Sequence, residues 1–214
     1  MDEYHKITTV YDRDPDNRYK TLLDGQFALP EFEYLAGNEW VFTEKLDGMN
    51  CRVDWDCERV LFGGRTDKSQ MPTFLFAKLQ EMFPAEKFAK LYPETPMTLY
   101  GEGIGAGIQK GGGNYIPDGV DFVLFDVLIG RWWLRREDVE DIAHRLGIQV
   151  VPIVGIGTLE EAIRIVQAGL PSRLGEREAE GLVMRPLVDL WGRDGKRIIS
   201  KVKGKGFGIW GGVT

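Results

Sequence analysis

The chain has 214 residues, of which 43% are hydrophobic and 28% are charged, and it carries a net charge of −6. These values exclude a disordered chain and leave room for a sizeable core, most simply in one domain. The acidic balance argues against non-specific nucleic-acid binding over the whole surface, although it allows a local basic groove.

The N-terminal residues carry no targeting signal that the sequence reveals. Residues 1–6 lack the basic-then-apolar pattern of a signal peptide, and no apolar run approaches the length of a membrane span. We therefore expect a cytoplasmic protein without a membrane partner. Residues 1–30 are polar and rich in turn formers, and we expect them to form an N-terminal arm packed on the domain.

Residues 39–66 are predicted to form a β meander. A charged segment at 44–50 separates a β-prone run at 39–43 from an alternating run at 51–55, which is typical of a hairpin. The segment places Lys45 between two carboxylates, and by itself a solvated surface turn is the ordinary explanation. The two cysteines, Cys51 and Cys57, form no C-x-x-C pair, and we expect reduced thiols and no structural zinc site.

Helical and β segments follow one another without a repeat. Apolar stripes predict helices over 73–83 and 88–92, and two later helices end at Gly147 and begin at Thr158 in a capping box. Strands are expected at 97–102, 120–129, 131–134, 149–154, 181–186, 197–203 and 207–210. This order indicates an α+β domain of antiparallel sheets flanked by helices, not a doubly wound parallel sheet.

The glycine-rich segment 101–113 matches neither of the usual nucleotide-binding loops. A P-loop requires Ser or Thr after its lysine, and Lys110 is followed by glycine. A dinucleotide fingerprint would lead into a helix, whereas here a loop follows. The segment is either a flexible turn or a backbone that passes close to a ligand, with Glu102 as its polar group.

Five short motifs occur in a fixed order between residues 44 and 203. They are E-K-L-D-G-M-N at 44–50, G-E-G at 101–103, F-D-V at 125–127, E-G-L-V-M-R at 180–185 and K-V-K at 201–203. K-x-D-G alone is a weak signal, but the ordered set resembles the covalent nucleotidyltransferase superfamily of ATP-dependent DNA ligases, RNA ligases and mRNA capping enzymes. The resemblance implies a single nucleotidyltransferase (ATP-grasp-like ligase adenylation) domain over residues 1–214, without an OB domain.

The resemblance also implies a role for each motif, although each residue alone has an ordinary structural explanation. A free lysine, with a pKa of about 10.4, is almost fully protonated at neutral pH, so a nucleophilic lysine needs nearby cations or burial. Lys201 and Lys203 would share one strand face and could supply those cations. The implied roles are Lys45 as nucleophile, Lys201 and Lys203 on the ATP phosphates, Glu180 on Mg²⁺ (or Mn²⁺), Glu102 on the ribose hydroxyls, Phe125 on adenine and Glu44 at the adenine edge.

Two residues favour the RNA ligases of the second phage type within this superfamily. Asn50 stands where DNA ligases carry arginine, and Arg65 matches an arginine implicated in contacts at the 5′-phosphate side and in nucleotide binding. Asp47 departs from the histidine of the phage prototype, and the G-E-G motif is looser than usual. The chain stops about ten residues after Lys203, which would suit either a minimal ligase or a shortened chain.

The expected function is therefore an ATP-dependent RNA ligase of the kind used in RNA repair. It would join 5′-phosphate and 3′-hydroxyl RNA ends, including those of a nicked duplex. We expect a viral-type, virus-encoded enzyme that acts as a monomer. The alternatives are a nicked-DNA ligase, a non-catalytic module that binds nucleic-acid ends and, least favoured, a capping-type GTP transferase.

Overall fold

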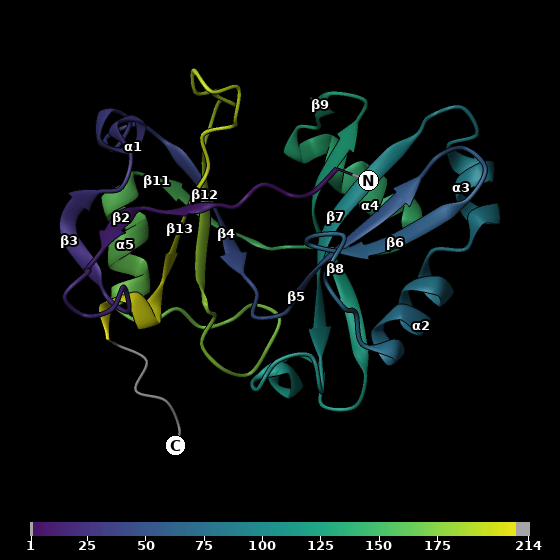
Figure 1. Cartoon of the computed structure of the whole chain (residues 1–214), viewed down its shortest axis with the longest axis horizontal. Coiled ribbons are helices and arrows are strands. Elements are labelled where there is room, and N and C mark those ends of the chain that lie inside the picture. The colour runs from purple at the N-terminus through teal and green to yellow at the C-terminus, as the bar shows by residue number, and fades with distance from the viewer. Residues whose placement is uncertain (1, 209–214) are drawn as a thin grey trace. The chain divides into compact units, whose positions relative to one another are not determined.

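The computed structural model describes residues 2–208, which form two compact units (Figure 1). The six-stranded unit comprises residues 2–5 with Asp47–Val151, and the five-stranded unit comprises Lys6–Leu46 with residues 152–208. Each unit has its own hydrophobic core and its own main sheet. Whether the two act together as one nucleotidyltransferase domain over residues 1–214 stays a prediction.

The sheet of the six-stranded unit has the strand order β10-β8-β7-β5-β6, with β9 paired to β8. Only the β10–β8 pair is parallel among these strands. The elements are β5 (Met49–Trp55), β6 (Val60–Gly64), α2 (Thr73–Met82), α3 (Ala85–Leu91), β7 (Met97–Gly105), the 3₁₀ helix η1 (Gly112–Asn114), β8 (Val120–Ile129), β9 (Trp132–Trp133), α4 (Arg136–Leu146) and β10 (Gln149–Val150).

The two faces of this sheet differ in chemistry because successive side chains of a strand alternate. On β5, Cys51, Val53 and Trp55 are buried in the core on which α2, α3 and α4 pack. The intervening residues, Asn50 and Arg52, therefore belong to the opposite face. The helices α2, α3 and α4 pack on the other face. We call the face that carries Asn50 and Arg52 the polar face of the six-stranded unit.

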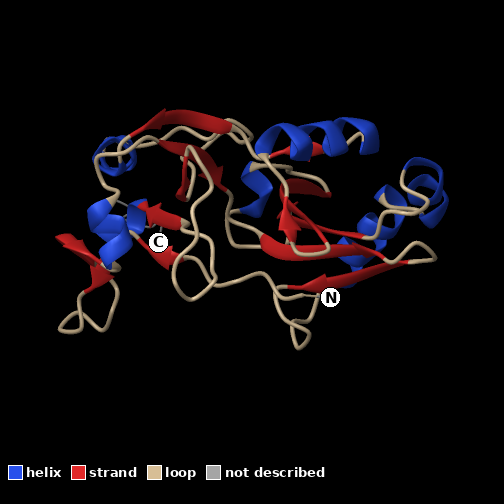
Figure 2. Cartoon of the chain, turned by 90° about the horizontal axis from the view of Figure 1, so that it is seen from above, coloured by secondary structure: helices blue, strands red, loops and turns tan. Residues whose placement is uncertain are grey.

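The five-stranded unit has the strand order β1-β13-β12-β4-β11, with a separate β2–β3 ribbon. The buried face of α5 packs on the Phe42, Leu182 and Val202 side of this sheet. Figure 2 shows the helices of the chain in blue and its strands in red. The elements are β1 (Thr8–Thr9), β2 (Tyr11–Arg13), β3 (Leu22–Phe27), α1 (Pro30–Tyr34), β4 (Trp40–Lys45), β11 (Ile153–Gly157), α5 (Leu159–Gln167), β12 (Gly181–Pro186), β13 (Ser200–Lys203) and the 3₁₀ helix η2 (Gly204–Phe207).

The predicted α+β class with mainly antiparallel sheets is confirmed, and every strand of residues 2–208 belongs to one of these three sheets, none of them an OB barrel. Residues 1–30, expected as an arm, contribute β1, β2 and β3 to the five-stranded unit and residues 2–5 to the other. No helix among residues 2–208 is long and apolar enough to cross a membrane.

The predicted hairpin at residues 44–50 is wrong. β4 pairs with β12 and β11, whereas β5 pairs with β6 and β7, so the segment after Lys45 leads from one sheet to another. Gly48 passes so close to β7 that a Cβ there would lie 2.3 Å from the Gly103 carbonyl oxygen. The local pattern of strand, turn and strand was correct, but it contains no information about which strand each one pairs with.

Two further strand predictions are corrected. The strand expected at 149–154 is divided into β10, which pairs with β8, and β11, which pairs with β4. Pro152 lies between them and has no N–H to continue a ladder. The strand expected at 207–210 is also wrong where the structure describes it, because Phe207 ends η2; residues 209 and 210 lie outside the described residues.

Candidate active site

Two lysines occupy one cross-strand row of the five-stranded unit. The register places Lys45 of β4 opposite Gly181 of β12, and Gly181 opposite Lys203 of β13. Residues in register point to the same face of a sheet, so the two lysines flank a position without a side chain. The opposite face of these strands is the core covered by α5.

Glu180, the residue before β12, joins the two lysines. Its Oε2 lies 2.6 Å from Lys45 Nζ, and its Oε1 accepts a hydrogen bond from Lys203 Nζ. Burial alone would raise the pKa of Glu180, but the neighbouring Lys45 and Lys203 ammonium groups outweigh it and lower the pKa. Glu180 is therefore ionised at neutral pH and pairs with both lysine side chains.

Gly181 is the residue that makes this row possible. It has a φ of +155°, and a Cβ at this position would lie 1.9 Å from the Val202 carbonyl oxygen and 2.8 Å from the Lys203 Cα. Any side chain would therefore push β13 away from β12.

Lys201 lies in the next row, opposite Val183, on the same strand face as Lys203. Burial first, and then the positive charges of Lys203 and Lys45, lower the pKa of Lys201 to about 8, although Glu180 acts in the opposite direction. Three amines around one carboxylate give this site a positive excess when all are charged. A polyphosphate would relieve the repulsion among the amines, so the arrangement suits an anionic ligand.

A divalent cation could be held here by Glu180 only with help from other ligands. No group of three or more His, Cys, Asp or Glu side chains among residues 2–208 is placed to bind a metal. Mg²⁺ and Mn²⁺ accept one carboxylate together with waters and phosphate oxygens. The donor set therefore fits a metal that arrives with a phosphorylated substrate, and it does not fit one bound by protein side chains alone.

Glu44 is engaged with a neighbouring loop. It is 2% exposed, and its two carboxylate oxygens accept hydrogen bonds from Ser172 Oγ and from the Arg173 backbone N–H at 2.5 and 2.8 Å. These contacts attach the 171–175 loop to the strand that carries Lys45. The role expected for Glu44 at the adenine edge stays a prediction, and the sequence carried no signal of the loop contact.

The polar face of the six-stranded unit brings Asn50 and Glu102 together. The register of β5 and β7 places the two residues directly opposite each other. Asn50 Oδ1 is buried without a hydrogen-bond partner among the described residues. A buried acceptor without a partner costs free energy, so this oxygen suits a ligand that brings a donor, such as a hydroxyl group.

Phe125 belongs to the same unit, at the bulge where β8 loses register with β7. Its ring lies edge-on to Tyr4, with 5.1 Å between the centroids, and Tyr4 also contacts Tyr100 at 5.1 Å. The Tyr4 hydroxyl donates to Asp126 Oδ2 at 2.7 Å. The Tyr4 contact was not predicted, because residues 1–30 were expected only to form an arm packed on the domain.

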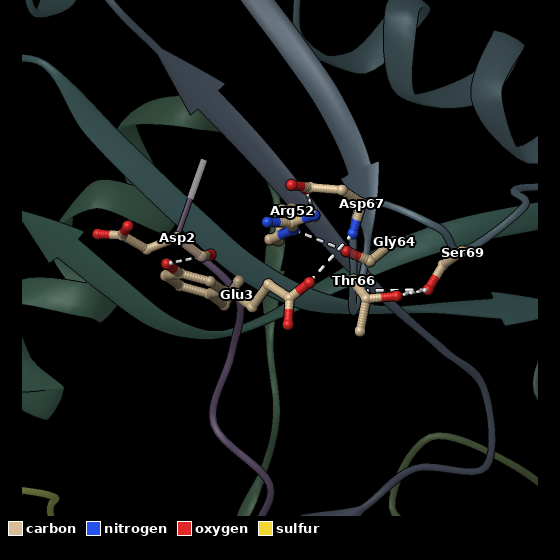
Figure 3. A network of polar contacts seen from close by, with 8 residues as sticks. Asp2, Glu3, Arg52, Gly64, Thr66, Asp67 and Ser69 are labelled. Carbon is tan, nitrogen blue, oxygen red and sulfur yellow. Dashed lines mark hydrogen bonds and ion pairs between the residues drawn. The ribbon is translucent and has the colours of Figure 1, made fainter.

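Arg65 directly follows β6 and is exposed. The turn behind it is closed by Thr66 and Ser69, whose hydroxyl oxygens lie 3.0 Å apart (Figure 3). Of the predicted site residues, the structure thus gathers Lys45, Glu180, Lys201 and Lys203 on one unit, with Glu44 behind them. Asn50, Glu102, Phe125 and Arg65 all lie on the other unit.

Known proteins resemble this chain in both sequence pattern and fold. A family model described as RNA ligase matches residues 38–203. A variant of Naegleria gruberi RNA ligase with ATP and Mn is similar over 95% of this chain, with a TM-score of 0.68 and 21% identity.

Two further structures of the same ligase are also similar. An apo variant matches over 93% of this chain with a TM-score of 0.65 and 22% identity, and the ligase with PPi matches over 92% with a TM-score of 0.64 and 24% identity. In each comparison the chain spans 56% of the length of the Naegleria protein. At this identity the likeness establishes the fold.

Proposed function

Because this chain belongs to the RNA ligase family, we propose that it is an ATP-dependent RNA ligase that joins 5′-phosphate and 3′-hydroxyl ends through a lysyl-AMP intermediate at Lys45. The observation that carries the proposal is the row in which Lys45 and Lys203 flank Gly181 and share Glu180. This row supplies a nucleophile and cations for the phosphates at one place.

The first step would transfer AMP to Lys45. The neutral amine attacks the α-phosphorus of ATP, the N–P bond forms, and the bond from that phosphorus to the β-phosphate oxygen breaks to release pyrophosphate. The Lys45 ammonium loses two protons to solvent overall, one before the attack and one as the bond forms. Lys45 must leave its ion pair with Glu180 before it can attack, because a charged amine has no lone pair to donate.

Lys201 and Lys203 would stabilise the transfer. Both lie on the strand face that carries Lys45, where their charges can meet the negative charge that builds on the phosphate oxygens. A divalent cation beside Glu180 would neutralise phosphate oxygens in the same way. ATP and Mn are present in a structure of the similar Naegleria ligase, which supports both as requirements here.

The second and third steps would act on RNA. An oxygen of the RNA 5′-phosphate attacks the lysyl-AMP phosphorus, the N–P bond breaks, and Lys45 takes up protons from solvent. The 3′-hydroxyl oxygen of the other end then attacks the RNA phosphorus, the hydroxyl proton goes to solvent, and AMP leaves. The substrate is RNA, and the enzyme acts as a monomer.

The polar face of the six-stranded unit would hold the nucleoside parts of these substrates. Phe125 is partly buried and offers a ring on which adenine can stack, while Glu102 can accept hydrogen bonds from the ribose hydroxyls. The buried Asn50 oxygen supports a contact with a hydroxyl of the RNA ligand. Arg65 would bind the RNA 5′-phosphate.

The proposal is tested by incubating the protein with α-labelled ATP and Mg²⁺, followed by denaturation. Wild type is expected to retain covalent label, and Lys45→Ala is expected to retain none, because the only proposed acceptor is gone. Lys205→Ala is the matched control, since Lys205 is an exposed lysine two residues after Lys203. Label on Lys45→Ala would show that the nucleophile is assigned wrongly.

The substrate is tested with matched nicks that carry either RNA or DNA at the 3′-hydroxyl end, and with single strands. We expect ends with an RNA 3′-hydroxyl to be joined faster. A strong preference for nicks made only of DNA would replace RNA ligase by DNA ligase. Label from GTP in preference to ATP would indicate a capping-type transferase, and binding of ends without any label would indicate a non-catalytic module.

A further inference from the structure

Arg52 is a fully buried cation on the polar face of the six-stranded unit. Its Nε donates to the Gly64 carbonyl oxygen at 2.6 Å, and its Nη2 donates to Asp67 Oδ1 at 2.7 Å (Figure 3). The Arg52 side chain is 0% exposed, whereas that of Asp67 is 75% exposed. The hydrogen bond from Arg52 lowers the pKa of Asp67, so the pair is ionised at neutral pH.

The two groups that accept from Arg52 lie on either side of Arg65. Gly64 precedes it, and Asp67 follows it by two residues. The backbone between them is held further by the Thr66–Ser69 contact and by the Asp67 N–H, which donates to Glu3 Oε1 at 3.3 Å. The backbone of Arg65 is thus fixed from both sides.

The side chain of Arg65 is left available by this arrangement. It is exposed, and no hydrogen bond or ion pair links it to another of the described residues. A guanidinium on a fixed backbone loses less conformational entropy when it binds a phosphate than one on a mobile loop. Arg52 also lies two residues after Asn50 on β5, so the strand that carries Asn50 also holds the Arg65 turn.

A buried arginine is an expensive way to hold a surface turn. Removing a guanidinium from water is unfavourable unless it is fully hydrogen-bonded, and an apolar residue would suit the middle of a β-strand better. The fixed fork of the guanidinium, however, can bind a carbonyl and a carboxylate at once and so set the distance between them. That property is useful where a turn must keep one geometry.

We propose that Arg52 and Asp67 form a clamp that positions Arg65 for the RNA 5′-phosphate. The clamp would therefore support AMP transfer to RNA, whereas lysine adenylylation would not depend on it. The inference rests on the proposed function. Arg52 and Asp67 are positioning residues here, because Arg65 is the group that would touch the substrate.

The test uses Asp67→Ala, which removes the exposed end of the clamp and leaves the buried arginine in place. Lysyl-AMP enzyme is isolated and mixed with 5′-phosphorylated RNA, and AMP transfer is followed in a single turnover. We expect the transfer rate to fall on the order of tenfold, less than the ~10²-fold loss typical of a 1 Å misplacement. The yield of lysyl-AMP from ATP is expected to match that of wild type.

Glu81→Ala is the matched control. Glu81 is a carboxylate of the same unit, 73% exposed and paired with Lys78, but it lies on α2 away from the Arg65 turn. It should change neither reaction. Asp67→Glu, which keeps a carboxylate, should recover much of the lost transfer rate, and thermal unfolding of each variant confirms that it is folded.

A double-mutant cycle with Arg65→Ala separates positioning from general stabilisation. If the clamp acts through Arg65, Asp67→Ala will slow AMP transfer in the wild-type background and have no further effect in the Arg65→Ala background. Additive effects, an equal loss of lysyl-AMP formation, or wild-type transfer by Asp67→Ala would each overturn the inference. If the wild type forms no lysyl-AMP at all, the proposed function fails first, and that outcome is seen before any RNA is added.

Discussion

The two sheet faces that carry the predicted site residues differ in kind. On the five-stranded unit the functional groups are charged, and they restrain one another through Glu180. On the six-stranded unit they include a neutral amide with a buried, unpaired oxygen and an aromatic ring. The first face suits an anionic ligand such as a phosphate, and the second suits a ligand that brings a hydrogen-bond donor or a flat ring.

Gly181→Ala is expected to have the largest effect on the charged face, which is the face of the five-stranded unit that carries Lys45, Lys201 and Lys203. Because the added Cβ would meet the Val202 carbonyl oxygen at 1.9 Å, we expect the free energy of unfolding to fall by about 2–4 kcal/mol and the lysyl label to be lost. Urea denaturation measures the first effect. Gly37→Ala, in the same unit and with no atom within 4 Å of its Cβ, should cost less than ~0.5 kcal/mol.

A wild-type stability for Gly181→Ala would mean that β12 and β13 are not held as closely as the register requires. Normal stability with loss of label would instead show that Gly181 matters for the reaction at Lys45 and not for the stability of the sheet.

A smaller effect is expected from Glu180→Gln, which removes the charge that restrains the lysines. At pH 7 we expect the free energy of unfolding to fall by about 1–3 kcal/mol, since Lys45 and Lys203 lose their shared counter-charge. The exposed Glu39→Gln should have almost no effect.

The pH dependence of this difference has a defined sign. The pKa of Glu180 is lower in the folded protein than in the unfolded chain, where it is about 4.3, so folding favours the ionised form. Its stabilisation is complete above the unfolded value and is lost as the pH falls through the folded one. Wild type and Glu180→Gln should therefore converge in acid; a constant difference across that range would contradict the ion-pair assignment.

The smallest expected effect is an uptake of protons by the protein when ATP binds, and it tests whether the phosphates contact the five-stranded unit. With a pKa of about 8, Lys201 is half protonated at pH 8, and a bound triphosphate should raise its pKa and draw in about half a proton. Calorimetry of ATP binding without divalent metal, in two buffers of different ionisation enthalpy, measures this uptake.

Two controls decide whether the uptake belongs to the charged face. Adenosine, which lacks phosphates, should bind without it, and Lys201→Arg should abolish it because arginine does not titrate in this range. Equal proton uptake with adenosine and ATP would show that Lys201 does not respond to the phosphates, and the assignment of phosphate binding to this face would be wrong.

Several elements followed from local sequence patterns alone. The boundaries of β8 and β12 were predicted as they are observed, and the Gly147 terminus of α4 and the Thr158 capping box of α5 were also found. These features depend on neighbours within one strand or one helical turn. The hairpin after Lys45 and the single strand at 149–154 were wrong because both required knowledge of distant pairing partners.

The candidate site also has residues that local patterns predicted and residues whose role depends on strand pairing. Motif order pointed to Lys45, Glu180, Lys201 and Lys203, but the importance of Gly181 depends on a contact with Val202, which only the β12–β13 register brings about. The Arg52–Asp67 clamp was missed because a single arginine in an alternating strand has no pattern of its own. Its significance lies in being fully buried.

The sequence by itself determined which residues are candidates for this protein's chemistry, because five short motifs in one order are improbable without a shared reaction. Only the tertiary structure decided how they are grouped. It placed Lys45, Glu180, Lys201 and Lys203 on one unit and Asn50, Glu102, Phe125 and Arg65 on the other, and it connected Lys45 to Lys203 through Glu180. Strand pairing joins residues far apart in the chain, and the energy of that pairing depends on burial and register that no local pattern contains.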